Sequence, residues 1–229
     1  MNRPSVVRAA VALLFLGAGL SLPVTSAAAP VPETDEQKAL YAIGAAMSRS
    51  TERLELSETE IQEFLRGFSD GLAGKAELEK PEEFGPLFEA FMNQRMEEVG
   101  KREKAASAEF LTQAAGEKGA TKAENGLVYL EQTPGAGEPP KPDDIVEVHY
   151  TGSLRDGKVF DSSRERGQPE TIQLARTMEC WKQALPKMKP GGRAIVTCPS
   201  EIAFGDRGSE MVKPGAALRF DIELIKVVR

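Results

Sequence analysis

The hydrophobic residues of this chain change their spacing at Asn125-Gly126, and that change limits the folds the chain can adopt. Before this point apolar residues recur every three or four positions, which is typical of amphipathic helices. After it they alternate with polar residues, most clearly from Leu218 to Leu224, which predicts β-strands with one buried face. We therefore expect an α+β protein, all-helical in its N-terminal half and dominated by a sheet in its C-terminal half.

Three helices are expected in the first half. The first covers residues 35–49, and the second follows Ser57, where Ser-x-x-Glu has the form of a capping box. The third could begin at Pro81 or at Pro86. We favour Pro86, because proline is tolerated in the first turn of a helix but not deep inside it.

The third helix is expected to act as a stalk. From residue 97 to residue 109 it is almost entirely charged or Ala, and a helix that is polar all round often bridges two domains. We expect these charges to form a solvated helix face. At about 1.5 Å per residue, 30 or so residues would reach about 45 Å.

The second half combines several strands with one short helix. Alternation predicts strands at 127–130, 146–150, 194–198 and 218–224, and an apolar stripe predicts a helix over 181–188. One helix that covers one face of such a sheet favours a half-barrel.

The N-terminus has the order of a secretory signal. Arg3 and Arg8 precede an apolar run over 9–22, and small residues follow Pro23. We expect residues 1–28 to be a signal peptide cleaved near Ala27–Ala29, and the mature protein to be periplasmic or secreted. The alternative is an uncleaved anchor, although the run is short for a stable bilayer span. No stable membrane anchor is expected.

Composition narrows the list of partners and cofactors. The formal net charge is −6, which argues against nucleic acid as a partner. There is one His and no Cys-x-x-Cys pair, so no metal site and no cofactor are expected.

The two cysteines are candidates for a disulfide. Cys180 precedes Trp181 on the short helix, and Cys198 shares a strand face with Ala194 and Val196 that should meet that helix. An exported protein can hold such a bond. The alternative is two buried thiols, a common state of Cys.

Six segments of the second half match one family in order and spacing over residues 127–229. These segments are 148–152, 156–163, Trp181, 188–192, 203–205 and 218–224. They resemble the peptidyl-prolyl cis-trans isomerases of the FKBP type. Segments 41–44, 67–72 and 125–129 further resemble the Mip-like (macrophage infectivity potentiator) branch of that family.

The resemblance implies a domain plan and a function. Residues 33–120 would form a helical domain that makes a homodimer and continues into the stalk. Residues 121–229 would form an isomerase domain, an antiparallel half-barrel sheet wrapped on one short helix. The protein would isomerise X-Pro bonds and act as a chaperone for unfolded or folding exported proteins, with macrolides as inhibitors. The alternative is a dimeric chaperone that holds unfolded clients through the same pocket with little or no catalysis.

The resemblance also implies the site residues. The catalytic pocket would be formed by Tyr150, Phe160, Asp161, Trp181, Phe204 and Phe220. Thr177, Met178 and Val212 would bind substrate, and the backbone N–H of Met178 would hold a substrate carbonyl. His149 lies on the opposite strand face and is expected to be a surface or structural residue.

The chain departs from the family pattern around this pocket. Thr177-Met178-Glu179-Cys180 replaces a common Val-Ile-x-Gly, Glu170 replaces an aromatic or small residue, and Phe204 replaces a common Tyr. We expect these changes to affect the isomerisation rate and the affinity for macrolides more than they affect the fold. Phe204 removes one hydroxyl donor, and a neutral hydrogen bond nets only about 0.5–1.5 kcal/mol.

Overall fold

The computed structural model describes residues 31–76 and 81–228. The chain divides into two compact units after Ala42, and the second contains every element beyond the first helix. The signal peptide expected over residues 1–28, with cleavage near Ala27–Ala29, lies outside the described residues. Within those residues, no helix has both the length and the apolar character needed to span a bilayer.

The described chain opens with α1 (Asp35–Ser48), the 3-10 helix η1 (Arg49–Leu54) and α2 (Glu58–Leu72). The predicted capping box is confirmed: the Ser57 hydroxyl accepts the N–H of Glu60, and the Glu60 carboxylate accepts the N–H of Ser57. Neither α1 nor α2 buries a residue, although both carry apolar residues at helical spacing. Their helical form is therefore set by local pattern and capping rather than by a core.

The long helix α3 (Pro81–Ala115) carries Pro86 inside it. The preferred start near Pro86 is therefore wrong. The first four N–H groups of a helix have no partner within it, so Pro86, just beyond them, removes a single helical bond.

Arg95 joins the middle of α3 to the elements before it. Its guanidinium donates to the carbonyl oxygens of Leu54 and Glu55 at 3.2 and 3.3 Å, and it forms an ion pair with Glu60. The hydrogen bond from Arg95, followed by those from the N–H and the hydroxyl of Ser57, lowers the pKa of Glu60 to about 2. The Glu60 carboxylate therefore serves both the α2 cap and the link to α3.

The charged part of α3 is not solvated all round, contrary to expectation. Val99, Glu103 and Ser107 share one face of the helix and are buried. Glu103 pairs with Arg155 at 2.8 Å, and a Cβ on Gly100, one turn earlier, would lie 3.2 Å from the Cβ of Pro214. The polar composition of this stretch predicted solvent exposure, but one face is packed. A buried charge such as Glu103 is tolerated there because it is paired.

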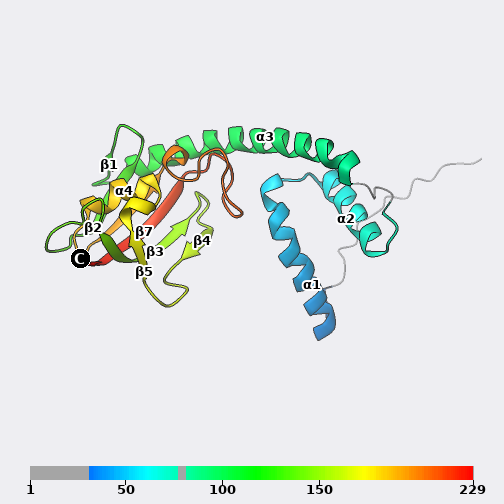
Figure 1. Ribbon diagram of the computed structural model, residues 1–229, viewed down its shortest axis with the longest axis horizontal. Coiled ribbons are helices and arrows are strands. Elements are labelled where there is room, and N and C mark those ends of the chain that lie inside the picture. Colours follow the sequence, from blue (N-terminus) through cyan, green and yellow to red (C-terminus); the bar gives the residue numbers. More distant parts are fainter. Residues whose placement is uncertain (1–30, 77–80, 229) are drawn as a thin grey trace, which may run out of the picture. The chain divides into compact units, whose positions relative to one another are not determined.

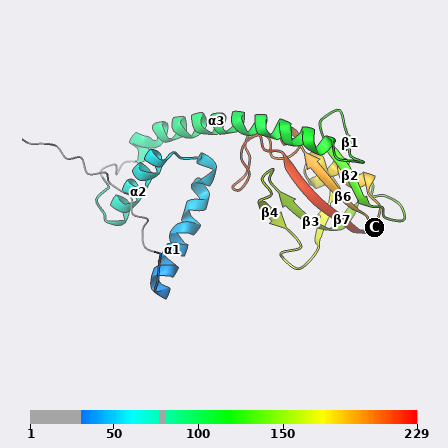
Figure 2. The same cartoon turned by 180° about the vertical axis from the view of Figure 1, so that it is seen from behind.

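Seven strands form one antiparallel sheet: six follow the order β1-β2-β6-β7-β3-β4, and β5 lies off this path and pairs with β3 (Figure 1, Figure 2). They are β1 (Thr121–Lys122), β2 (Val128–Thr133), β3 (Ile145–Ser153), β4 (Val159–Ser162), β5 (Glu170–Gln173), β6 (Arg193–Cys198) and β7 (Leu218–Val228). β4 pairs with the end of β3, and β5 pairs with its beginning. The predicted α+β fold class is confirmed, and the strands that were missed are too short to show a period.

The predicted short helix is present as α4 (Glu179–Ala184), continued by the 3-10 helix η3 (Leu185–Lys187). It lies on one face of the sheet (Figure 1). Ala184, Leu185 and Met188 join the inward-facing residues of β3, β6 and β7 in one buried core.

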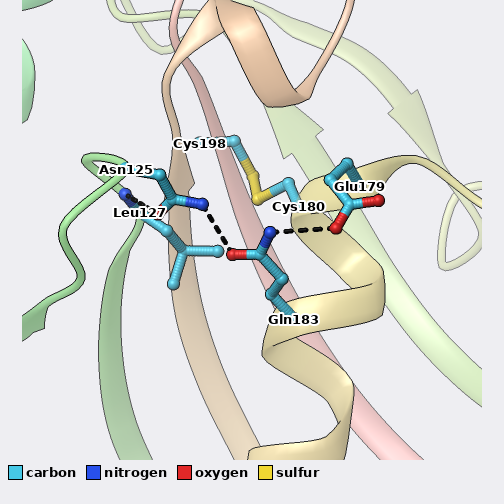
Figure 3. Close-up of a disulfide and its surroundings, with 6 residues drawn as sticks. All are labelled: Asn125, Leu127, Glu179, Cys180, Gln183 and Cys198. Atoms are coloured by element: carbon cyan, nitrogen blue, oxygen red, sulfur yellow. Dashed lines mark hydrogen bonds between the residues drawn. A yellow bond between two sulfur atoms is a disulfide. The ribbon is translucent and has the colours of Figure 1, made fainter. Parts of the chain in front are cut away.

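A disulfide joins α4 to the sheet. Cys180 and Cys198 are fully buried and bonded, with their Cα atoms 5.9 Å apart (Figure 3). Nearby, the Asn125 amide donates to the Gln183 side-chain oxygen at 2.7 Å, so the turn before β2 is also held to α4. The helix is thus fixed to two separate strands.

The second face of the sheet meets α3. Strand alternation places Val128 of β2 and Thr197 of β6 on the side away from α4, and both are buried. The end of α3 contacts these two strands, and Arg219 of β7 donates to Glu117, just past the helix, at 2.7 Å. α3 is therefore packed onto the sheet at its C-terminal end.

The disulfide should contribute substantially to stability. Its cysteines are 18 residues apart, and closing a loop of about 15 residues is worth about 3 kcal/mol through the entropy of the unfolded chain. We expect Cys180→Ala/Cys198→Ala to lower the free energy of unfolding by about that amount, measured by urea titration. Wild-type protein in reductant should lose a similar amount. A count of two free thiols in denatured, unreduced protein would contradict the bond.

Candidate active site

Five aromatic side chains from five parts of the fold meet in one cluster. Tyr150 lies on β3, Phe160 on β4, Trp181 on α4, Phe204 after the 3-10 helix η4 (Ser200–Ile202), and Phe220 on β7. We call these residues the aromatic cluster. All five were expected to line the pocket.

Trp181 is the centre of the aromatic cluster. Its ring lies 5.0 Å from that of Tyr150 and 5.3 Å from that of Phe220, both edge-to-face. That geometry suits the positive edge and negative face of aromatic rings. Trp181 is only 3% exposed, so it forms the base of the cluster.

The aromatic cluster reaches the surface at Phe160 and Phe204. Phe160 packs edge-to-face on Phe220 at 5.8 Å and on Phe204 at 6.4 Å. Phe160 is half-buried, and Phe204 is 36% exposed. Apolar aromatic surface is therefore offered to a ligand at this end.

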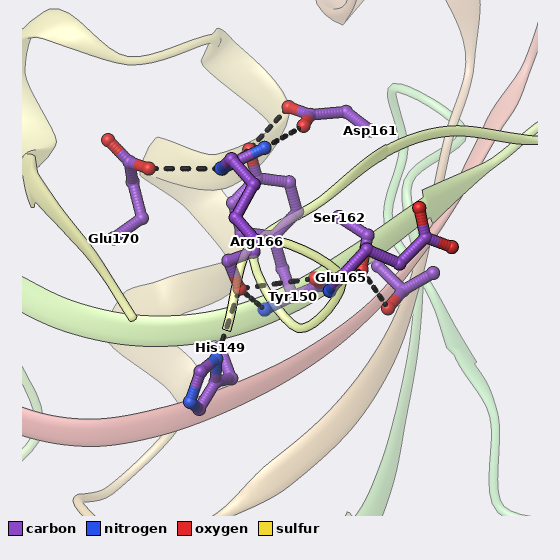
Figure 4. Close-up of polar contacts among 9 residues, drawn as sticks. His149, Tyr150, Asp161, Ser162, Glu165, Arg166 and Glu170 are labelled. Carbon is purple, nitrogen blue, oxygen red and sulfur yellow. Dashed lines mark hydrogen bonds and ion pairs between the residues drawn. The ribbon is translucent and has the colours of Figure 1, made fainter. Parts of the chain in front are cut away.

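A network of charged and phenolic groups borders the cluster (Figure 4). The Tyr150 hydroxyl donates to the Asp161 carboxylate, which also pairs with Arg166. Arg166 donates to the Tyr150 hydroxyl oxygen at 3.1 Å and to Glu170 at 3.0 Å. We call Asp161, Arg166 and Glu170 the charged rim.

The pKa of two of these groups is shifted. Burial raises the pKa of the Tyr150 phenol, and its hydrogen bond to Asp161 raises it further. The bonds to Tyr150 and Asp161 raise the pKa of Arg166. Tyr150 is therefore a neutral donor at physiological pH, and Arg166 is a permanent cation.

Sequence reasoning missed Arg166. Two arginines follow Asp161 closely, and no local pattern separates Arg166 from Arg164, which pairs instead with Glu223 at 3.0 Å. Glu170 was noted only as a departure from the family pattern. Its partner explains the charge at that position.

Thr177 and Met178 lie at the start of α4 and are both half-buried. The Thr177 N–H donates to the Leu174 carbonyl at 3.3 Å. The Met178 N–H makes no hydrogen bond within the part of the chain that the structure describes. Of these two expected binding residues, Met178 has the backbone donor available.

Val212 and His149 lie away from the exposed end of the aromatic cluster. Val212 is fully buried among the core residues, so it packs behind the cluster rather than at its exposed end. His149 Nδ1 lies 3.2 Å from the hydroxyl of buried Ser163, which also accepts the N–H of Tyr150 at 2.8 Å. His149 is thus linked to the site through Ser163, whose hydroxyl accepts the backbone N–H of Tyr150.

Gly152 on β3 makes room for two walls of the cluster. A Cβ at this position would lie 2.7 Å from Phe160 Cζ and 2.9 Å from Phe220 Cε1. A glycine inside a strand often marks such a close approach, so the sequence carried a signal for it. Among the described residues, no group of three or more His, Cys, Asp or Glu could hold a metal ion.

Replacing Gly152 should damage the site more than the fold. We expect Gly152→Ala to push the Phe160 and Phe220 rings apart and to lower kcat/KM on an X-Pro peptide by about tenfold, as misplacement of binding groups does. Ser153→Ala, the adjacent change on the other strand face, is the control. Equal kcat/KM for the two variants would contradict this role.

Family models match both halves of the chain. Residues 136–225 match FKBP-type peptidyl-prolyl cis-trans isomerase, and residues 36–130 match the domain amino-terminal to FKBP-type peptidyl-prolyl isomerase. A probable FKBP-type peptidyl-prolyl cis-trans isomerase of Haemophilus influenzae is 33% identical, over 84% of this chain and 86% of the relative. The peptidyl-prolyl cis-trans isomerase Mip of Coxiella burnetii is 32% identical, over 94% and 96%.

A solved structure has the same architecture. The crystal structure of FkpA from Escherichia coli matches with a TM-score of 0.59 and 32% identity, covering 86% of this chain and 98% of that one. With these relatives and both family models, the chain belongs to the FKBP-type peptidyl-prolyl cis-trans isomerase family.

Proposed function

We propose that the protein isomerises X-Pro bonds at the aromatic cluster and acts as a folding chaperone for exported proteins. The observation that carries this proposal is the edge-to-face series of five rings that runs from Tyr150 through buried Trp181 to exposed Phe204, bordered by the charged rim. Relatives named as FKBP-type isomerases, FkpA and Mip support it.

The chemistry needs neither a nucleophile nor a metal. An X-Pro bond has partial double-bond character, with a rotation barrier of about 18–20 kcal/mol. Uncatalysed isomerisation takes tens to hundreds of seconds. Twisting the bond reduces its conjugation and its polarity, so an apolar environment around the proline ring favours the twisted form over the planar one.

One polar group would hold the substrate during this rotation. The free N–H of Met178 would donate a hydrogen bond to a substrate carbonyl and fix one side of the bond. The neutral Tyr150 hydroxyl donates to Asp161 and accepts from Arg166, so it would anchor the charged rim beside the apolar walls. Such binding accelerates the rotation because it is stronger for the twisted bond than for the planar one.

The domain plan and location belong to the same proposal. Residues 33–120 serve dimerisation and form the stalk, and residues 121–229 form the isomerase domain, after export and removal of residues 1–28. Macrolides would compete with substrate for the aromatic cluster. Clients are recognised as unfolded or folding exported chains with X-Pro bonds.

The helical region supports a homodimer because its apolar residues are left uncovered. Phe64 and Leu65 of α2 and Leu87 and Phe88 of α3 are more than a third exposed. Together with Leu54, Phe91 and Met92, Phe64 and Phe88 line one apolar groove. Contiguous exposed apolar surface of this kind marks an interaction site. A second copy would supply the same apolar faces and cover both.

A protease-coupled assay on an X-Pro peptide tests the catalytic proposal. We expect wild-type protein to accelerate isomerisation and Phe160→Ala to lower kcat/KM by at least about tenfold, because it removes the wall between Phe204 and Phe220. Val159→Ala, an exposed neighbour on β4, should behave as wild type. No acceleration at micromolar wild-type protein would contradict catalysis and leave a client-holding chaperone.

Light scattering on residues 29–229 tests the dimer. We expect twice the chain mass, and a shift towards monomer for Phe64→Glu, since a carboxylate is costly in an apolar interface. Gln62→Glu adds the same charge elsewhere on α2 and should stay dimeric. A monomer mass for the wild-type protein would defeat the proposal.

A further inference from the structure

The segment from Pro199 to Ala217 joins β6 to β7 and carries two expected site residues, Phe204 and Val212. We call it the β6–β7 loop. In both views this orange segment lies beside the middle of α3 (Figure 1, Figure 2). The contacts between them give α3 a direct connection to the aromatic cluster.

A buried hydrogen bond fixes the end of the β6–β7 loop. The Ser107 hydroxyl on α3 accepts the N–H of Ala217 at 2.8 Å, and the two residues are 4% and 0% exposed. A buried N–H without a partner is unfavourable, so this bond holds Ala217 in place. Ala217 directly precedes β7, which carries Phe220.

Two glycines bring the helix and the loop into contact. A Cβ on Gly100 of α3 would lie 3.2 Å from the Cβ of Pro214, closer than ordinary van der Waals contact. Gly215 has a φ of +74°, and a Cβ there would lie 3.1 Å from the Gly100 carbonyl oxygen. A glycine in mid-helix weakens the helix, so its presence indicates a packing requirement.

The contact continues from the helix to the site through the loop itself. The Gly215 N–H donates to the Gly205 carbonyl at 3.0 Å, and Gly205 directly follows Phe204. Phe204 in turn packs on Phe160. Displacement of Pro214 by α3 would therefore be passed to the exposed end of the aromatic cluster.

Ion pairs on both sides of these contacts hold the helix in register. Glu103, 7% exposed, pairs with Arg155 in the turn after β3, and this bond raises the pKa of Arg155. Lys104 pairs with Asp206 of the loop at 2.6 Å. The second pair is exposed and contributes little by itself.

We propose that α3 positions the isomerase site, with Gly100 and Ser107 as positioning residues that set the β6–β7 loop and, through it, Phe204 and Phe220. α3 is then a structural part of the catalytic domain as well as a stalk. The proposal rests on the assignment of the aromatic cluster as the isomerase site.

Gly100→Ala and Ser107→Ala in the full-length chain test this role. Thr112→Ala is the matched control: Thr112 is exposed on the same helix, and its hydroxyl donates to the Ala108 carbonyl of α3 itself. Two quantities are measured well below the unfolding temperature of each variant. One is kcat/KM on an X-Pro peptide, and the other is the indole N–H signal in ¹H–¹⁵N NMR, which is a single peak because Trp181 is the chain's only tryptophan.

We expect Gly100→Ala and Ser107→Ala to lower kcat/KM about fivefold and to shift the Trp181 signal, with Thr112→Ala unchanged in both. A purely structural role would lower only the unfolding temperature. Gly100→Ala separates the two roles, because Ala favours the helix while its methyl group presses on Pro214. If Ser107→Ala does not fold, Gly100→Ala alone decides.

Unchanged kcat/KM and an unchanged Trp181 signal in the folded variants would overturn the positioning role. Absence of turnover in the wild-type protein would instead count against the isomerase assignment. In that case the Trp181 signal still decides whether α3 positions the cluster: a shift supports it, and no shift overturns it.

Discussion

The packing of Trp181 between Tyr150 and Phe220 is the interaction on which the rest of the structure depends. It places α4 on the sheet with its ring edge-to-face against two strands, and the adjacent Cys180 is bonded to Cys198 of β6. Because protein interiors are close-packed, a shift of Trp181 would move both neighbouring rings. The same contacts that hold the core together therefore set the geometry of the candidate site.

Much of the fold could be predicted from the sequence, because strand alternation and the Ser57 capping box are local signals. The burial of Glu103 and Ser107 could not, since a polar helix pattern indicates solvent and their partners come from distant segments. For the site, helical spacing alone would assign Trp181 to the core, and strand alternation would assign Phe220 to it, where their burial does place them. Only the family resemblance indicated a second role.

The site combines an apolar interior with the charged rim, and the two parts have different physical roles. The buried rings form the apolar interior, while Tyr150 stays neutral and is oriented by Asp161 and Arg166. Glu170 completes this border by holding the second guanidinium nitrogen. In the helical half, by contrast, apolar residues remain uncovered, so that half gains its stability from association in our proposal. α3 belongs to both halves, so it physically links the proposed dimerisation region to the isomerase domain.

Exchange NMR on an X-Pro peptide tests the central claim most directly, because it observes cis and trans forms without a coupling protease. With substoichiometric full-length protein, the account predicts exchange cross-peaks between the two forms well within the tens of seconds of the uncatalysed reaction. The indole signal of Trp181 should shift as peptide is added. A Trp181 shift without exchange cross-peaks would make the cluster a binding site alone. The absence of both the shift and the cross-peaks would contradict the account altogether.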